Sequence, residues 1–149
     1  SQAWHTEEIR SVRPTPVDEA RWGFSVIENS LWEAVPEFLR ELEEYLKSEF
    51  DITLPLDAKA VQFSSWMGGD RDGNPFVTSK VTEEVLMLAR RRAAKLFSLD
   101  MDQLYIELSM NDCNEKLREM VGDAKEPYRA ALRNIGNKLE KTSSNLLPI

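Results

Sequence analysis

The sequence is poor in the residues that build disulfides and zinc sites. Its 149 residues include one cysteine, Cys113, and one histidine, His5. A lone cysteine excludes an internal disulfide framework and any multi-cysteine zinc site, and it fits a reducing compartment. No run approaches the roughly 20 apolar residues that a membrane-spanning helix needs. The first ten residues lack the basic and then apolar order of a signal peptide. We therefore expect a cytoplasmic protein that does not bind membranes.

Positive charge is also scarce. Nineteen Lys and Arg residues stand against 26 Asp and Glu residues, so the formal charge is −7. Binding to nucleic acid relies on clustered Lys and Arg, and this balance therefore predicts no nucleic-acid partner. Hydrophobic residues make up 42% of the chain and charged residues 30%, which is typical of a folded chain.

Apolar residues recur at three- and four-residue steps along most of the chain, which predicts helices. The expected helix starts carry capping residues or a first-turn proline, and they lie at Thr15 and Pro16, Thr78 or Ser79, Asn111 or Asp112, and Pro127. The first pattern continues past Pro36, as two helices or as one helix kinked there. The last pattern is expected to fray from Thr142 onward.

Residues 60–65 alternate apolar and polar side chains, which predicts one short strand. No internal repeat and no low-complexity linker divides the chain. The expected fold is mainly α: an irregular helical assembly with at most one short strand before a glycine-rich loop. Residues 1–149 are expected to form a single helical segment without an internal domain boundary.

The glycine-rich loop is the most informative segment. Three of the six glycines, Gly68, Gly69 and Gly73, fall within six residues. Clustered glycines allow backbone conformations closed to other residues and let the main chain approach a ligand. Turn chemistry alone explains such a composition about as well as a ligand site does.

Two known types of ligand loop are excluded by spacing. An EF-hand calcium loop starting at Asp70 needs glycine at its sixth position and glutamate at its twelfth, where this chain has Pro75 and Val81. A Walker-type phosphate loop needs Gly-Lys-Ser/Thr, where this chain has Gly73, Asn74 and Pro75. Neither calcium nor a nucleotide phosphate is therefore expected here.

An anion contact through Arg71 is the ligand hypothesis that survives. The planar guanidinium suits bidentate binding of a carboxylate or phosphate, and Asp70 and Asp72 would hold it in place. Trp66 and Met67 would supply an apolar wall beside it.

Residues 63–75 closely resemble a signature of the phosphoenolpyruvate carboxylase family. Five further blocks resemble the same family in the same order, at residues 4–10, 13–20, 28–32, 107–110 and 126–129. The resemblance covers nearly the whole chain up to Thr142. Thirteen consecutive matching positions with ordered flanking blocks are far more specific than one glycine-rich loop.

The resemblance implies a carbon–carbon lyase with a larger α/β barrel-type fold. Such an enzyme joins bicarbonate to phosphoenolpyruvate, releases oxaloacetate and phosphate, and uses magnesium. In the family mechanism carboxyphosphate and the enolate of pyruvate form first, and carbon dioxide then adds to the enolate. The resemblance also implies an allosteric homotetramer as the parent enzyme, with the remainder of the enzyme chain as the partner of this segment.

The resemblance also assigns residues to roles. Trp66 would line the apolar pocket around the methylene carbon of the substrate, where excluding water protects the enolate from a proton. The implied catalytic residues are Trp66 and Arg71, and the implied substrate-binding loop comprises Met67, Gly68, Gly69, Asp70, Asp72, Gly73 and Asn74. Arg10 and Arg129 match residues that bind an activating sugar phosphate in plant members. A solvated or ion-paired surface side chain is the alternative for both arginines.

The family's catalytic histidine and its metal-binding carboxylates belong to blocks that this sequence does not contain. His5 lies in a different block, and the magnesium ligands are expected outside this chain. We therefore expect an internal fragment from the N-terminal part of the enzyme, inactive alone and with exposed apolar surface where partner helices are missing. The alternative is a non-catalytic helical interaction module.

Overall fold

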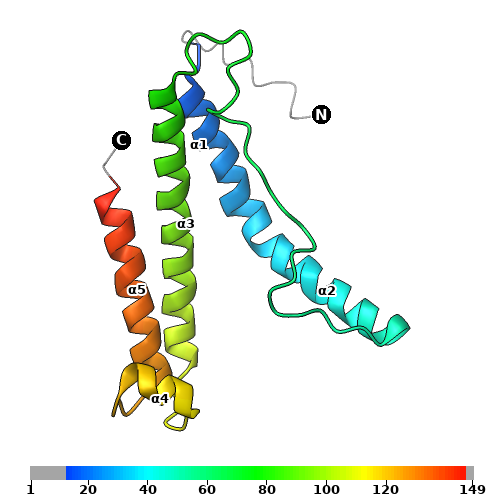
Figure 1. The fold of residues 1–149 in the computed structure, drawn as a ribbon, viewed down its shortest axis with the longest axis vertical. Coiled ribbons are helices and arrows are strands. Elements are labelled where there is room, and N and C mark those ends of the chain that lie inside the picture. Colours follow the sequence, from blue (N-terminus) through cyan, green and yellow to red (C-terminus); the bar gives the residue numbers. More distant parts are fainter. Residues whose placement is uncertain (1–12, 147–149) are drawn as a thin grey trace, which may run out of the picture. The chain divides into compact units, whose positions relative to one another are not determined.

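The computed structural model describes residues 13–146, so His5 and Arg10 lie outside the described residues. The element order is α1 (Pro16–Val26), the π-helical segment η1 (Ile27–Leu31), α2 (Trp32–Phe50), α3 (Ser79–Glu107), α4 (Glu115–Val121) and α5 (Pro127–Asn145) (Figure 1). The prediction of a mainly helical chain is confirmed. No helix within residues 13–146 combines the length and the apolar character that crossing a bilayer would require.

The chain divides into two compact units, Ser1–Thr82 and Glu83–Ile149, and the boundary falls within α3. In the first unit, Val17, Ala20 and Phe24 of α1 are buried, as is Val77 in the loop before α3. In the second unit, α4 packs against α5, whose first residue, Pro127, is fully buried.

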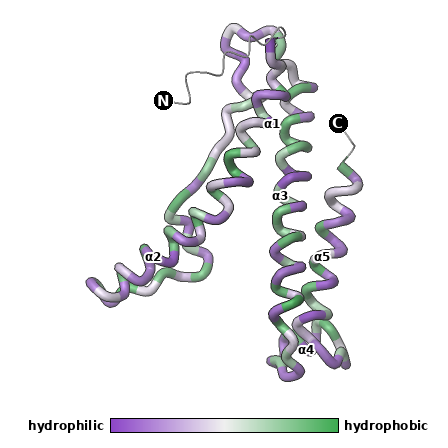
Figure 2. Tube along the Cα trace, turned by 180° about the vertical axis from the view of Figure 1, so that it is seen from behind, coloured by the Kyte–Doolittle hydropathy of each residue, from purple (hydrophilic) through white to green (hydrophobic). Residues whose placement is uncertain are grey.

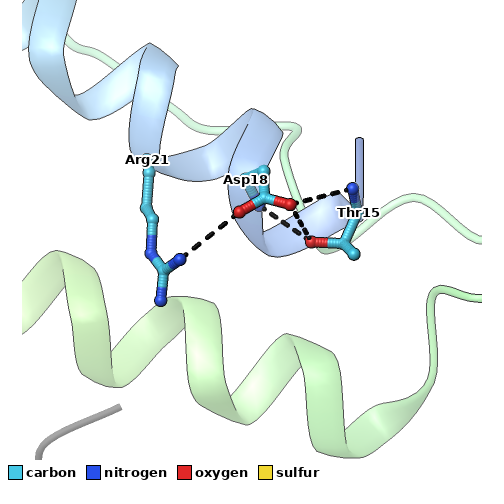
Figure 3. Close-up of polar contacts among 3 residues, drawn as sticks. All are labelled: Thr15, Asp18 and Arg21. Carbon is cyan, nitrogen blue, oxygen red and sulfur yellow. Dashed lines mark hydrogen bonds and ion pairs between the residues drawn. The ribbon is translucent and has the colours of Figure 1, made fainter. Parts of the chain in front are cut away.

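Helix α1 begins at Pro16, as the sequence predicts, and the structure shows a capping box at this end (Figure 3). Thr15 has an extended backbone, and its Oγ1 accepts a hydrogen bond from the Asp18 N–H at 3.2 Å. The Asp18 carboxylate accepts in return from the Thr15 N–H at 3.1 Å and from the Thr15 hydroxyl at 2.7 Å. These bonds satisfy N–H groups that the first helical turn would otherwise leave unpaired.

Replacing Thr15 by alanine is expected to lower the free energy of unfolding by about 0.5–2 kcal/mol. The Thr15 hydroxyl, followed by the Thr15 backbone N–H, lowers the pKa of Asp18 below its ordinary value. A lowered folded pKa means that this stabilisation is complete above the pKa of the unfolded chain and is lost as the pH falls through the folded pKa. Thermal melts followed by circular dichroism should therefore show a larger Thr15→Ala penalty at neutral than at acid pH. Thr15→Ser should melt like the parent, and an equal penalty at both pH values would contradict the role of the carboxylate.

The irregular part of the first helical stretch lies before Pro36. Helix α1 passes through η1 into α2, and the Trp32 N–H bonds to the Ile27 carbonyl, five residues back. Pro36 lies inside α2. The prediction placed the change at the proline itself, because proline lacks an N–H and crowds the preceding turn. The π-helical turn instead changes the hydrogen-bond register one turn earlier.

Residues 60–65 do not form the predicted strand, and no strand occurs anywhere in residues 13–146. Residues 60–65 are all exposed and lie in an irregular connection between α2 and α3. Alternation favours a strand only where a neighbouring strand accepts its hydrogen bonds. The part of the chain that the structure describes offers no such neighbour.

Two predicted helix boundaries in the second unit were wrong. Asn114 caps α4 by accepting from the Leu117 N–H at 2.9 Å, rather than Asn111 or Asp112. Helix α5 continues to Asn145 rather than fraying from Thr142. The Thr142 hydroxyl donates to the Lys138 carbonyl at 2.8 Å, so this polar residue bonds within the helix instead of ending it.

Helix α2 has no buried residue along its 19 positions, although its apolar residues repeat at helical spacing (Figure 2). Phe38, Tyr45 and Phe50 are each at least half exposed. The other positions of the helix carry mostly charged side chains, such as Glu37, Glu41 and Glu44. The expected exposed apolar surface is therefore present on α2.

Candidate active site

The glycine-rich loop leads directly into α3, and Thr82 in the second turn of that helix ties the loop to it. The Thr82 hydroxyl donates to the carbonyl of Gly68 at 2.7 Å. Arg71 donates from its guanidinium to the same Thr82 oxygen in a long bond of 3.5 Å. Thr78 caps the helix, because its Oγ1 accepts from the Val81 N–H at 3.3 Å. The predicted cap at Thr78 or Ser79 is confirmed at Thr78.

Two consecutive turns give the loop its shape. In the first, the Trp66 carbonyl accepts from the N–H groups of Gly69 at 3.2 Å and Asp70 at 3.4 Å. In the second, the Arg71 carbonyl accepts from the Asn74 N–H at 3.4 Å. Gly68 and Gly73 adopt φ angles of 70° and 69°, a left-handed conformation that other residues adopt only at a cost. The glycines are therefore required by the turns themselves.

Asn74 closes the C-terminal end of the loop. Its side-chain Oδ1 accepts from the Phe76 N–H at 3.0 Å, and its carbonyl accepts from the Val77 N–H at 3.2 Å. This is an Asx turn, in which a short amide side chain takes the place of a backbone acceptor. Both oxygens of Asn74 thus accept hydrogen bonds from the backbone just before α3.

Asp70 lies at the centre of the loop's polar contacts. One carboxylate oxygen accepts from the Trp66 indole Nε1 at 2.8 Å, and the other accepts from the Asp72 N–H at 3.0 Å. The bond from the Asp72 backbone, followed by the bond from the Trp66 indole, lowers the pKa of Asp70 below its ordinary value. Asp70 is therefore ionised at neutral pH, and each of its carboxylate oxygens accepts a bond from the loop.

Trp66 and Met67 point to different surroundings. Trp66 is 78% exposed, so its indole faces outward from the loop. Met67 packs on α1, where its sulfur and terminal methyl fill the space that a Cβ at Gly23 would need. Gly23 thus makes room for Met67, which anchors the loop to α1, while the indole remains accessible.

The Arg71 guanidinium reaches Thr82, and within residues 13–146 no ion pair joins it to Asp70 or Asp72. Its side chain is exposed. The expected bracing of Arg71 by the two aspartates is thus replaced by a hydroxyl contact, and its charge is not neutralised by a partner in the loop. An exposed, unneutralised guanidinium suits contact with a carboxylate or phosphate.

Clusters of metal-binding side chains were sought among the residues that the structure describes. Within residues 13–146 no group of three or more His, Cys, Asp and Glu side chains lies close enough together to hold a metal ion. Asp70 already accepts two bonds from the loop, as described above.

Arg129 in the first turn of α5 makes several contacts in the second unit. It donates to the carbonyls of Tyr105 at 2.8 Å and Ile106 at 3.3 Å, in the last turn of α3, and to the Glu126 carboxylate at 2.7 Å. Its guanidinium also lies 5.1 Å from the centre of the Tyr105 ring. Arg10, with which it was expected to bind a sugar phosphate, lies outside the described residues.

Sequence reasoning did not identify Thr82 or Tyr105 as partners of these sites. Thr82 had a usable signal, because it lies four residues after the helix cap at Thr78 and so faces the loop that enters the helix. No sequence pattern pointed to Tyr105, because its partners Arg129 and Arg133 lie 24 and 28 residues later in the chain. Only the packing of α5 brings these three side chains together.

Known proteins match this chain over nearly all of its length. A sequence model described as phosphoenolpyruvate carboxylase matches residues 1–147. The phosphoenolpyruvate carboxylase of Aeromonas hydrophila is 60% identical over 146 residues, which cover 98% of this chain and 17% of the relative. The corresponding protein of Tolumonas auensis is 61% identical over 142 residues, 95% of this chain and 16% of the relative. That of Vibrio vulnificus is 58% identical over 147 residues, 98% of this chain and 17% of the relative. This chain, which spans only about 17% of its curated relatives, belongs to the phosphoenolpyruvate carboxylase family.

Proposed function

We propose that this chain is part of an enzyme that carboxylates phosphoenolpyruvate with bicarbonate, giving oxaloacetate and phosphate. The observation that carries the proposal is the match to one carboxylase family over residues 1–147. The loop at residues 66–74 supports it, because that loop presents an exposed indole and an exposed guanidinium from a backbone fixed by its own turns. An apolar ring and a guanidinium held in fixed positions suit a small anionic substrate, because the guanidinium can bind its charge while the ring contacts its apolar part.

In this proposal the two exposed side chains act on the substrate and the others shape the loop. Trp66 forms the apolar wall beside the methylene carbon, and Arg71 pairs with an anionic group of the substrate. Gly68, Gly73 and Asn74 set the turns from which these side chains project. Met67 anchors the loop to α1 through Gly23.

The remaining properties are proposals for the whole enzyme. We infer a cytoplasmic homotetramer that uses magnesium, with metal ligands and a catalytic histidine supplied by parts of the enzyme other than residues 13–146. A sugar phosphate bound at Arg129 would have to displace the Glu126 carboxylate and the carbonyls of Tyr105 and Ile106 from the guanidinium.

A chimera tests the proposal directly. The 146 matched residues of the Aeromonas hydrophila relative are replaced by those of this chain, and oxaloacetate formation is followed in a coupled assay with malate dehydrogenase. Turnover that depends on both phosphoenolpyruvate and bicarbonate is expected. A chimera that assembles like the parent but yields no oxaloacetate would favour the alternative of a non-catalytic interaction module.

The isolated 149-residue chain is expected to form no oxaloacetate from phosphoenolpyruvate, bicarbonate and magnesium. Its described residues hold no cluster of metal-binding side chains, and its one histidine, His5, matches a non-catalytic block of the family. The same coupled assay measures this, with the active chimera as the positive control. Turnover above background that disappears in Trp66→Ala would show that the isolated chain is itself a catalyst.

A further inference from the structure

The orientation of the exposed Trp66 indole depends on one side chain. An indole that is 78% exposed has few packing contacts to restrict its rotamers. Its Nε1–H donates to the Asp70 carboxylate at 2.8 Å. A hydrogen bond to an ionised acceptor is stronger than one between neutral groups, so it can hold an exposed ring where packing does not.

Asp70 is itself held at three points. Its N–H donates to the Trp66 carbonyl at 3.4 Å, so Trp66 and Asp70 are joined both through their side chains and through the backbone. The second carboxylate oxygen accepts from the Asp72 N–H at 3.0 Å. The turn between the two residues contains Gly68, whose carbonyl is fixed to Thr82 of α3. The indole is therefore linked to the start of α3 through its bond to Asp70 and through the turn that Thr82 holds.

Consecutive side chains in the loop also serve different partners. Asp70 bonds to the indole, whereas the next residue, Arg71, reaches Thr82. Each oxygen of the Asp70 carboxylate accepts one bond from within the loop, and the bond to the indole joins the Asp70 side chain directly to that of Trp66. This bond therefore suits Asp70 to orient Trp66.

We propose that Asp70 is a positioning residue that fixes the Trp66 indole as the apolar wall of the site. The proposal rests on the proposed function, in which Trp66 lines the substrate pocket. It assigns Asp70 no direct contact with substrate and no proton transfer. The effect of Asp70 on carboxylation therefore passes through Trp66.

The first test is spectroscopic and needs no activity. In a nitrogen-15-labelled sample of the full 149-residue chain, Trp66→Phe identifies the Trp66 indole N–H signal. In Asp70→Ala this signal is expected to shift and its exchange with water to accelerate by about tenfold or more. Asp72→Asn is the matched control, because it removes the same charge two residues away but keeps the backbone N–H that bonds to Asp70. An indole signal unmoved in Asp70→Ala, with the circular dichroism unchanged, would overturn the proposal.

The second test separates this proposal from the proposed function. In the chimeric carboxylase, Asp70→Ala is expected to lower kcat/KM, and the double variant Asp70→Ala/Trp66→Ala should be no slower than Trp66→Ala alone. A double variant slower than Trp66→Ala by the full factor of Asp70→Ala would mean that Asp70 acts independently of Trp66, and the positioning role would be rejected. Wild-type kinetics in Trp66→Ala would instead reject the role of Trp66 in the site, whatever the spectroscopic result.

Discussion

Replacing Trp66 by alanine in the chimeric carboxylase is expected to lower kcat/KM by about 100-fold or more and to leave the melting temperature unchanged. The indole is 78% exposed, so its removal costs little folding free energy. The loop keeps its shape, because its backbone turns and the Gly68–Thr82 bond do not involve the indole ring. Without the ring, water reaches the position where an enolate would form, and protonation competes with carboxylation.

Two further variants separate the effect of an apolar ring at residue 66 from the effect of holding that ring in one orientation. Phe76→Ala is the matched control, because Phe76 is an aromatic residue with 63% exposure, lies two residues after Asn74 and has no assigned role in the site. It is expected to leave kcat/KM unchanged. Trp66→Phe keeps an apolar ring but has no Nε1–H for Asp70, so we expect a loss between those of Phe76→Ala and Trp66→Ala. Equal rates in Trp66→Ala and Phe76→Ala would show that aromatic area at residue 66 is irrelevant to the chemistry.

The helix start at Thr15 and the turns of the loop were predictable because their causes are local. A threonine followed by proline and, three residues later, by aspartate specifies a capping box without help from the rest of the chain. Gly68 and Gly73 likewise mark backbone angles that few other residues adopt. Local rules failed where several polar residues competed, as at Asn111 and Asn114, each of which is a good helix cap.

The rest of the site depends on contacts that no local pattern specifies. The sequence placed Met67 and Trp66 together in one apolar wall. In the structure Met67 instead packs on α1, in space that is open because residue 23 is glycine. Asp70 and Asp72 on either side of Arg71 indicated ion pairs, yet the guanidinium reaches Thr82. In both cases a residue from another element decides where the side chain goes, and sequence spacing alone does not reveal it.

Arg129→Ala is expected to lower the free energy of unfolding of the chain by about 2 kcal/mol. Its side chain is only 25% exposed, and its bonds reach two carbonyls that the end of α3 leaves without partners inside the helix. Denaturant unfolding followed by circular dichroism measures the loss. Arg133→Ala is the matched control, because the Arg133 guanidinium also lies over the Tyr105 ring, 5.2 Å from its centre, and donates to the Tyr105 hydroxyl rather than to a carbonyl at the end of α3. It should cost about 0.5–1 kcal/mol.

The same variant distinguishes a structural Arg129 from a phosphate-binding one. If the guanidinium mainly holds the end of α3, replacing chloride by inorganic phosphate at equal ionic strength should leave the stability difference between the parent and Arg129→Ala unchanged. If the guanidinium binds phosphate in the folded chain, phosphate should stabilise the parent and not the variant, because a ligand that binds only the folded state raises its stability. The three bonds to Tyr105, Ile106 and Glu126 favour the first result, since phosphate would have to replace them before it gained a contact.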